Sequence, residues 1–372
     1  MRLRDVCASP SAEEIPTQPP TVKACSSRRP RRHLLQMFPA LLLLLVAIAA
    51  QAQQYTKFVV FGDSLSDTGN DATLFVDMYG FPFPSPYIGT TYTGLYTLGR
   101  FTDGSDTFPP AQHYFGVWVE QLATALPAHP AVMASLQGGR NYAYGYGNTL
   151  NGTTVFNVTG TPFTIIVDNV GQQIDDYLAT SPKIDNHTLF VVWGGANNLT
   201  EAVGQPNAPQ MVVDGAIAQI GNVQRLIDAG GTQFLVLNLP NLGSVPRFNT
   251  SPTESVAFNQ ASVLYNATLD TGVSLLPILN FGRPVTIHKL DVYSLLKNII
   301  SSPADYGLLN ATDSSQSMLV DPDTYLFWDD IHPTTRGHNL LSQAALQVIE
   351  PHGCLIQISP GEYAGSGAPG CR

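Results

Sequence analysis

Two kinds of hydrophobic pattern alternate along the chain. Short runs of β-branched and aromatic residues predict strands, and the first run ends at Gly62, as expected of a buried strand. Longer segments with apolar residues at helical spacing predict helices. The predicted strands are Tyr55 to Phe61, Thr188 to Trp193, Gln233 to Leu239 and 284–291. The predicted helices are 115–126, 164–178, 209–229, 254–279, 292–301 and 333–349.

This alternation of strand and helix predicts one α/β domain. We expect a three-layer sandwich in which a parallel sheet carries helices on both faces. Gly230 and Gly231 end the 209–229 helix, and Pro333 suits the first turn of the last helix, where a missing N–H costs no hydrogen bond. No linker, internal repeat or appended binding module interrupts the pattern.

The composition excludes two classes of protein. The chain has 372 residues, of which only 12% are charged, and its formal net charge is −10. Disordered chains and nucleic-acid-binding proteins need a dense charge pattern that is missing here. Many of the Lys and Arg residues lie within residues 1–52, so the remaining body is strongly acidic. This balance favours a secreted hydrolase working in acidic surroundings.

Residues 1–52 have the pattern of a targeting segment. A basic cluster, Arg28 to Arg32, precedes the apolar run Phe38 to Ala50, and Ala50-Gln-Ala52 matches the small-x-small pattern of a signal-peptidase site. The apolar run is shorter than the roughly 20 residues of a membrane span. We expect a signal peptide, a secreted extracellular protein and no stable membrane insertion; a signal anchor is the alternative. Met37 is an alternative to Met1 as the start, which would make residues 1–36 an extension of the gene model.

Cysteines and sequons agree with secretion. After residue 52 only Cys354 and Cys371 remain, flanking a Gly/Pro-rich tail. We expect one disulfide in an oxidising compartment, and two free thiols are the alternative. The expected organisation is an N-terminal extension with signal peptide (1–52), an α/β domain (53–353) and a C-terminal tail (354–372). Seven Asn-x-Ser/Thr sequons suit an extracellular glycoprotein: Asn151, Asn157, Asn186, Asn198, Asn249, Asn266 and Asn310.

The first candidate for chemistry is Ser64, which follows the first predicted strand in the block Phe61-Gly-Asp-Ser64-Leu. Parallel sheets place their ligands at the carboxyl ends of their strands. A serine there can turn its hydroxyl to the crevice while its own N–H helps to bind an oxyanion. The chain lacks the Gly-x-Ser-x-Gly elbow of α/β-hydrolases. The alternative is a Gly-Asp-Ser turn that only caps a helix.

The second candidate is the pair Asp329 and His332, just ahead of the last predicted helix. A tight loop can present the carboxylate to one imidazole nitrogen while the other nitrogen faces a serine, as a serine nucleophile requires. Asp330 is the rival acid and His338 the rival base. His338 lies inside the predicted helix, where we expect it to face solvent. The alternative is a surface loop in which Asp329 and His332 only cap the helix.

With these two blocks the chain resembles the GDSL esterase/lipase family, also called SGNH hydrolases. Gly62-Asp-Ser64-Leu65 and Asp329-x-x-His332 match its first and last signature blocks, and Gly138 to Gly145 and Gly195-Ala-Asn197-Asn198 match the two between them. The segment Gly99-Arg-Phe-Thr-Asp-Gly104 also looks familial. The resemblance covers about residues 55–350 and implies a flavodoxin-like three-layer fold.

The resemblance further implies an oxyanion hole. Its donors are the amide of Ser64, the side chain of Asn197 and a backbone amide of the second block, for which the spacing leaves either Gly145 or Tyr146. The family usually has Asp where this chain has Asn198, a change expected to alter loop hydrogen bonding rather than remove chemistry. We expect Asn198 to stay unglycosylated because a glycan would crowd the site. An insertion at about residues 105–115 could line the substrate entrance.

No zinc site, P-loop or dinucleotide fingerprint is found, and the acids from Asp321 to Asp323 lack the glycine and bidentate acid of a calcium loop. The resemblance therefore implies a cofactor-independent secreted serine esterase. It looks most similar to fungal carbohydrate acetylesterases, which predicts short, acetyl esters as substrates. The alternatives are a lipase or phospholipase for longer acyl chains and a catalytically silent carbohydrate-binding relative. We expect a monomer whose partners are small-molecule or oligosaccharide esters.

Overall fold

The computed structural model describes residues 55–80, 99–103, 114–157, 162–180, 182–316, 320–350, 355–359 and 362–365. By its internal contacts the chain divides into Met1–Gln51 and Ala52–Arg372, and all described residues belong to the second unit. The expected signal peptide, both tail cysteines and nearly all of the 105–115 insertion lie outside the described residues. The expectations for them stay predictions.

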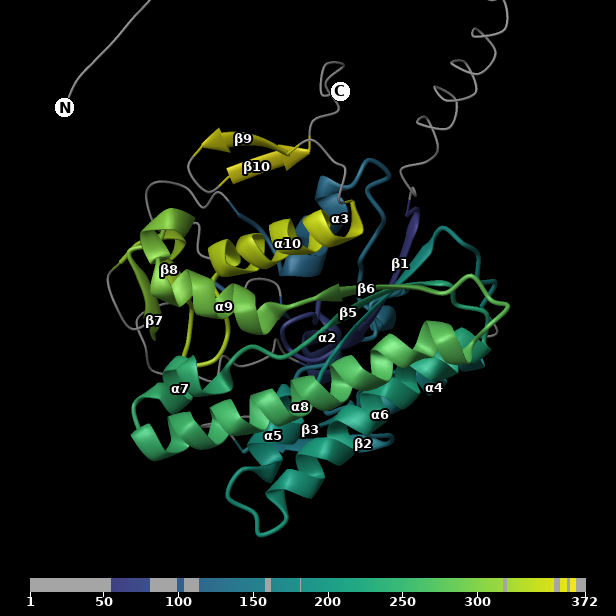
Figure 1. Ribbon diagram of the computed structural model, residues 1–372, viewed down its shortest axis with the longest axis horizontal. Coiled ribbons are helices and arrows are strands. Elements are labelled where there is room, and N and C mark those ends of the chain that lie inside the picture. Colours follow the sequence, from purple (N-terminus) through teal and green to yellow (C-terminus); the bar gives the residue numbers. More distant parts are fainter. Residues whose placement is uncertain are drawn as a thin grey trace, which may run out of the picture. The chain divides into compact units, whose positions relative to one another are not determined.

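Four parallel strands form the central sheet in the order β1-β4-β5-β6 (Figure 1). They are β1 (Lys57–Gly62), β4 (Thr188–Trp193), β5 (Gln233–Leu237) and β6 (Thr286–Leu290). All four predicted strands are confirmed, and none of their ends moves by more than two residues. Val60 also forms an isolated parallel bridge with Asn141, so the second signature block runs beside β1.

Helices cover both faces of this sheet (Figure 1). One face carries α4 (Val170–Ala179), α6 (Ala208–Asp228) and α8 (Pro252–Leu279), and the other carries α3 (Trp118–Ala125) and α10 (Thr335–Ile349). The predicted three-layer α/β sandwich is therefore confirmed. Among the described helices, none combines the length and the apolar character that crossing a membrane requires.

Smaller elements surround the sheet. The further α-helices are α2 (Asn70–Tyr79), α5 (Ala196–Ala202), α7 (Pro246–Asn249) and α9 (Val292–Ser301). The 3₁₀ turns are η2 (Ser135–Gln137), η3 (Leu242–Ser244), η4 (Pro303–Tyr306) and η5 (Pro322–Thr324). The paired strands are β2 (Thr153–Asn157) with β3 (Thr164–Asp168), β7 (Asn310–Ser314) with β8 (Tyr325–Phe327), and β9 (Leu355–Ser359) with β10 (Glu362–Gly365).

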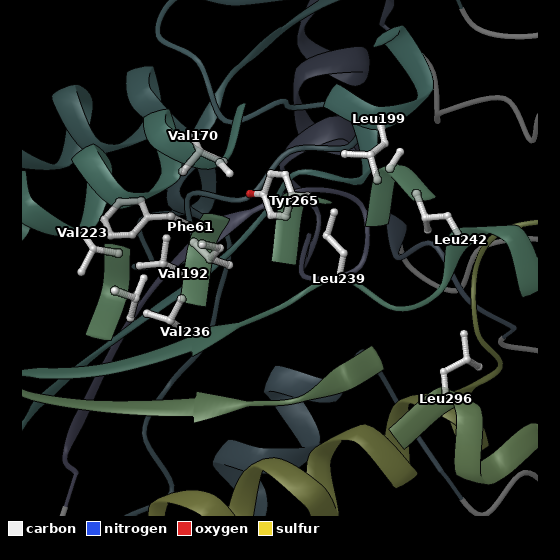
Figure 2. Packing of buried hydrophobic residues seen from close by; sticks show 14 of the residues in the cluster. Phe61, Val170, Val192, Leu199, Val223, Val236, Leu239, Leu242, Tyr265 and Leu296 are labelled. Atoms are coloured by element: carbon white, nitrogen blue, oxygen red, sulfur yellow. The ribbon is translucent and has the colours of Figure 1, made fainter. Parts of the chain in front are cut away.

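Alternate residues of each central strand enter different hydrophobic cores. Phe61, Val192 and Val236 pack toward α4, α6 and α8, where Figure 2 shows them near Val170 and Val223. The intervening residues, such as Val60 and Val191, pack toward α3 and α10. Because both faces of β1, β4 and β5 are buried, these three strands appear in the sequence as nearly continuous apolar runs rather than as an apolar/polar alternation.

One predicted helix was wrong in its first part. The segment 164–178 is strand β3 up to Asp168 and becomes helix α4 only at Val170. Within β3, Ile165 and Val167 are buried while Ile166 is exposed, which is the two-residue period of a strand paired with β2. The apolar spacing of the longer window thus joined two elements with different periods.

Candidate active site

Ser64 lies in the turn that follows β1, at the carboxyl end of the sheet. The strand ends at Gly62, where a Cβ atom would come within 2.5 Å of the Trp193 carbonyl oxygen of β4. Only glycine fits so close to the neighbouring strand. Gln173 of α4 holds this glycine with two hydrogen bonds, donating to its carbonyl over 2.8 Å and accepting from its amide over 2.9 Å. The chain therefore leaves β1 toward Ser64 in a fixed direction.

The structure brings Ser64, His332 and Asp329 together across 268 residues of sequence. Nε2 of His332 lies 3.0 Å from the Ser64 Oγ, and Nδ1 of the same ring lies 2.7 Å from Oδ2 of Asp329. This is the serine, base and acid order that nucleophilic acyl chemistry uses.

The Asp329 carboxylate is 2% exposed and is held by its own loop. Its Oδ1 accepts hydrogen bonds from the amides of Ile331, at 2.8 Å, and His332, at 2.6 Å. Burial by itself raises the pKa of Asp329, but the His332 ring and these amides outweigh it and lower the pKa to about 2. The acid is therefore ionised wherever the imidazole can act as a base.

Both rival residues have other partners. Asp330 forms a bidentate pair with Arg247 of α7, with nitrogen–oxygen distances of 2.9 and 2.7 Å. His338 does not face solvent, so that prediction was wrong. It is fully buried between α10 and α3, and its Nδ1 accepts a hydrogen bond from the Trp118 amide at 3.2 Å. Burial lowers the pKa of His338 to about 3, which keeps the ring neutral.

Asn197 lies in the first turn of α5, directly after β4, and lines the same cavity as Ser64 and His332. Its Nδ2 donates to the Gly147 carbonyl over 3.0 Å, which joins the second and third signature blocks. The preceding Gly195 has φ +123°, and a Cβ there would meet the ring of Tyr265 at 2.4 Å. The Tyr265 hydroxyl of α8 donates to the Gly194 carbonyl over 2.9 Å, so α8 helps to hold this turn in place.

The turn from Tyr144 to Gly147 carries the two candidate amides. The Gly147 amide donates to the Tyr144 carbonyl over 3.3 Å, and Tyr146 sits at φ +63° with its ring stacked 3.4 Å from that of Phe156. Gly145 lies against the buried carboxyl of Asp71: a Cβ on Gly145 would fall 2.4 Å from Oδ2 of that residue, which is 1% exposed. Burial, together with the nearby Asp67, raises the pKa of Asp71. The choice between Gly145 and Tyr146 as oxyanion donor stays a prediction.

Asn198 takes a structural place beside the site. Its Oδ1 accepts hydrogen bonds from the Thr149 amide, at 3.0 Å, and from the Thr149 hydroxyl, at 3.1 Å. An amide oxygen thus performs the accepting role open to the carboxylate that the family usually has here. With only 5% of Asn198 exposed, its side chain is poorly placed to carry a glycan. Its predicted lack of glycosylation has this burial in its favour.

An apolar cavity of about 90 Å³ opens beside Ser64 and His332. Its walls come from the segment after β5, from α9 and from the loop before α10, and Figure 2 shows Leu239, Leu242 and Leu296 from the first two of these. Other apolar lining residues are Pro240, Val245, Val292, Leu295, Ile299, Leu326, Phe327 and Ile331. Asp63 and Asn197 are the polar groups at the Ser64 end.

Sequence patterns did not assign roles to Gln173, Tyr265, Arg247 or Phe101. Each acts on the site through a contact between segments that are distant in sequence, and each residue type is also common in ordinary cores and surfaces. Phe101 alone carried a signal, because it lies within the familial segment Gly99 to Gly104. The signal marked the segment but did not indicate what it contacts.

Comparisons with known proteins give a family match and several related sequences. The family model described as GDSL-like Lipase/Acylhydrolase matches residues 58–345. A thermolabile hemolysin of Vibrio parahaemolyticus is 26% identical over 324 residues, which cover 80% of this chain and 65% of the hemolysin. Lipase 1 of Photorhabdus luminescens is 23% identical over 383 residues, covering 84% of this chain and 53% of the lipase. The chain thus spans between half and two thirds of the length of these relatives.

Two shorter proteins are matched over more of their length. An acetylesterase of Thermothelomyces thermophilus is 27% identical over 298 residues, covering 78% of this chain and 87% of the acetylesterase. Among solved structures, an acetylxylan esterase from Geobacillus stearothermophilus is 11% identical, with a TM-score of 0.38 over 79% of this chain and 93% of the esterase. A TM-score this low supports no further argument.

Backbone strain at Tyr146 gives a testable difference between two variants. Tyr146→Ala and Tyr146→Gly both remove the ring from Phe156, but only glycine relieves the left-handed backbone. We expect the glycine variant to be the more stable of the two by ~0.5–1 kcal/mol, net of the entropy that glycine gains when unfolded. Urea unfolding of both variants measures this difference. An alanine variant as stable as the glycine variant would show that the strain is absent.

Buried carboxyls around the site predict that stability falls as pH rises. Burial raises the pKa of Asp63, Asp67 and Asp103 from 3.8 to about 6. The contribution of these carboxyls to the free energy of unfolding is complete below pH 4, where they are protonated in both the folded and the unfolded protein. It is lost as pH rises through 6, because the folded protein must then bury their charge. Asp329 acts oppositely, but only as pH falls from 3.8 toward 2. We expect a Tm on the order of 5 °C higher at pH 5 than at pH 8.

Calorimetry across this pH range tests the expectation. Asp103→Asn removes one titrating group while leaving an oxygen that can accept the hydrogen bonds of Thr335, so its Tm should depend less on pH than that of the parent. A parent Tm that is flat or increases between pH 5 and pH 8 would contradict the assignment.

Proposed function

The chain belongs to the GDSL-like lipase/acylhydrolase family, and from that premise we propose that it is a cofactor-independent serine ester hydrolase. The observation that carries the proposal is the hydrogen-bonded relay from Ser64 through His332 to Asp329. The hydroxyl, the imidazole and the buried carboxylate are each within direct hydrogen-bond reach of the next, so no rearrangement is needed before the first proton moves.

In the proposed reaction, His332 Nε2 takes the hydroxyl proton as Ser64 Oγ bonds to the ester carbonyl carbon. Collapse of the tetrahedral intermediate breaks the bond to the alcohol, which leaves with that proton. Water then attacks the acyl-serine ester, giving one proton to His332, which returns it to Oγ as the carboxylic acid departs. Asp329 holds the imidazole in one tautomer and stabilises its cationic form.

The negative charge on the carbonyl oxygen needs hydrogen-bond donors on one side. The Asn197 amide has two hydrogens, of which one is used by the Gly147 carbonyl, and we assign the other to the oxyanion. The Ser64 amide is the second donor. The third donor is the amide of Gly145 or of Tyr146, which lie next to each other in the turn that follows the bridge of Asn141 to β1.

The apolar cavity supports an acyl chain longer than acetyl. Its lining joins Ser64 with Leu239, Leu296 and Ile299, and most of its other lining residues are apolar too. Each methylene that it takes out of water contributes about 0.8 kcal/mol, or roughly a fourfold gain in kcat/KM. We therefore propose esters of medium-chain acids as the preferred substrates.

Acetyl esters of carbohydrates are the second candidate. The supporting observation is the 27% identical acetylesterase of Thermothelomyces thermophilus, which the chain matches over most of its length. Under this proposal the sugar would lie outside the apolar cavity, and the cavity would be left largely unused. The two candidates therefore differ in the dependence of rate on acyl length.

Export from the cell and action as a monomer on small-molecule or oligosaccharide esters are also part of the proposal. Its support is the residue pattern of Phe38 to Ala52 and the acidic body of the chain. Sequencing the N-terminus of protein recovered from the culture medium of a eukaryotic host would find Gln53 first if cleavage follows Ala52. Light scattering of the same protein gives its mass in solution.

Replacing the two adjacent acids separates the catalytic one from its rival. Asp329→Asn should lower kcat for p-nitrophenyl esters about 10⁴-fold because the imidazole loses its tautomer control. Asp330→Asn is the matched control and should lower kcat less than about tenfold, since the Asp330 carboxylate pairs with Arg247 rather than with His332. Ser64→Ala, assayed beside them, should abolish turnover. Equal rates for Ser64→Ala and the parent would instead support the carbohydrate-binding alternative.

A series of p-nitrophenyl esters measures the acyl preference. We expect kcat/KM to rise from acetyl to hexanoyl by ~10-fold or more and then to level off. Leu296→Trp fills the cavity and should lower hexanoyl turnover much more than acetyl turnover. Lys297→Trp, on the exposed side of the same helix, should leave the ratio of hexanoyl to acetyl turnover unchanged. A parent enzyme fastest on acetate, with a ratio unaffected by Leu296→Trp, would favour the acetylesterase candidate.

A further inference from the structure

The familial segment Gly99 to Gly104 has no part in the proposed reaction, yet its described residues, 99–103, lie between the main parts of the site. At one end, a Cβ on Gly99 would come within 2.3 Å of the Ala72 Cβ of α2. Arg100 next to it forms hydrogen bonds to both carboxylate oxygens of Glu120, at 2.5–3.1 Å, and Glu120 also accepts from the Val117 amide at the start of α3.

The other end of the segment is bonded to the chain that follows His332. The Thr102 hydroxyl donates to the Pro333 carbonyl over 3.0 Å. Asp103 is 3% exposed and accepts from both the amide and the hydroxyl of Thr335, at 2.5 and 3.1 Å. The backbone on either side of Phe101 is therefore tied to α3 and to the start of α10.

Between these two anchors, the Phe101 ring contacts both halves of the catalytic machinery. The ring is 5% exposed, and its centroid lies 5.1 Å from that of the His332 imidazole, with 33° between the planes. On the oxyanion side, a Cβ on Gly145 would fall 2.7 Å from Cζ of the same ring. Phe101 thus occupies the space between the base and the turn that carries the oxyanion amide.

We propose that Phe101 is a positioning residue that fixes the distance between the His332 imidazole and the Gly145–Tyr146 turn. The inference rests on the proposed function. The proton acceptor and the oxyanion donors have to act on the same carbonyl group, and the two come from segments nearly 190 residues apart in sequence. The Phe101 ring contacts both segments.

The shape of the side chain matters for this role. A flat ring presents one broad surface to the imidazole while its far edge reaches the glycine turn. A leucine side chain is shorter and cannot reach both, so the imidazole gains freedom to turn away from Ser64 Oγ. Displacement of a reacting group by about 1 Å can lower a rate about 100-fold. We expect kcat to fall 10- to 100-fold in Phe101→Leu, with KM changed less than about threefold, because the apolar acyl cavity is not altered.

Phe234→Leu is the matched control. Phe234 of β5 is fully buried, stacks on Phe190 in the core beside α6 and α8, and loses the same atoms on substitution. The control should lose stability with a near-parental kcat. Phe101→Met, whose unbranched side chain packs more adaptably, replaces Phe101→Leu if the latter does not fold.

The assay is hydrolysis of one p-nitrophenyl ester by the full protein and its variants, with Ser64→Ala included. Lower kcat with nearly constant KM in Phe101→Leu alone supports the inference. A parental kcat in the folded variant, or a loss of kcat equal to that of Phe234→Leu, overturns it while leaving the serine mechanism intact. Turnover that survives Ser64→Ala removes the proposed function and this inference together.

Discussion

The buried carboxylate of Asp329 is the interaction on which the rest of the site depends. An ion with 2% exposure is stable only if hydrogen bonds replace its lost water. Two amides of its own loop and the imidazole of His332 supply them, and the Trp328 amide closes the loop by donating to the His332 carbonyl over 2.8 Å. Rotating the imidazole away would leave the charge short of a donor, so the requirement that stabilises Asp329 also directs Nε2 toward Ser64.

Two strands of the parallel sheet, β1 and β4, lead into the site beside this loop, and the backbone at or just after the end of each requires a glycine. β1 stops at Gly62 because a side chain there would strike β4, and β4 continues into Gly195 because Tyr265 occupies the space of a side chain. Gln173 and Tyr265, from helices on the same face, hydrogen-bond the backbone at these two points. Ser64 and Asn197 thus take their places from the backbone of a buried sheet, whose strands cannot shift without opening the core.

The sequence allowed prediction of those features whose cause is local. Strands β1, β4 and β5 are mostly apolar on both faces, and Asp329 and His332 lie three residues apart, so a short window contains the whole signal. Predictions became wrong where the cause lies elsewhere in the chain. The strand β3 needs β2 as its partner, and His338 is buried because α3 packs over it. Phe101 acts on His332 and Arg247 acts on Asp330, in each case across more than 80 residues of sequence, which no window can contain.

Asp329 and Asp330 show why spacing alone cannot assign a catalytic acid. Asp329 lies three residues before His332 and Asp330 lies two residues before it, so by spacing either carboxylate could orient the imidazole. The one that turns inward meets two amides and an imidazole, and its pKa falls despite burial. The Asp330 carboxylate turns outward and pairs with the guanidinium of Arg247 in α7. The Arg247 backbone amide also donates to the Asp330 carbonyl over 2.7 Å. Arg247 thereby holds the loop from outside while Asp329 holds it from inside. Asp329 is therefore the catalytic acid because its carboxylate meets hydrogen-bond donors in the interior. Asp330, through its pair with Arg247, helps to hold the loop in the conformation that turns Asp329 inward.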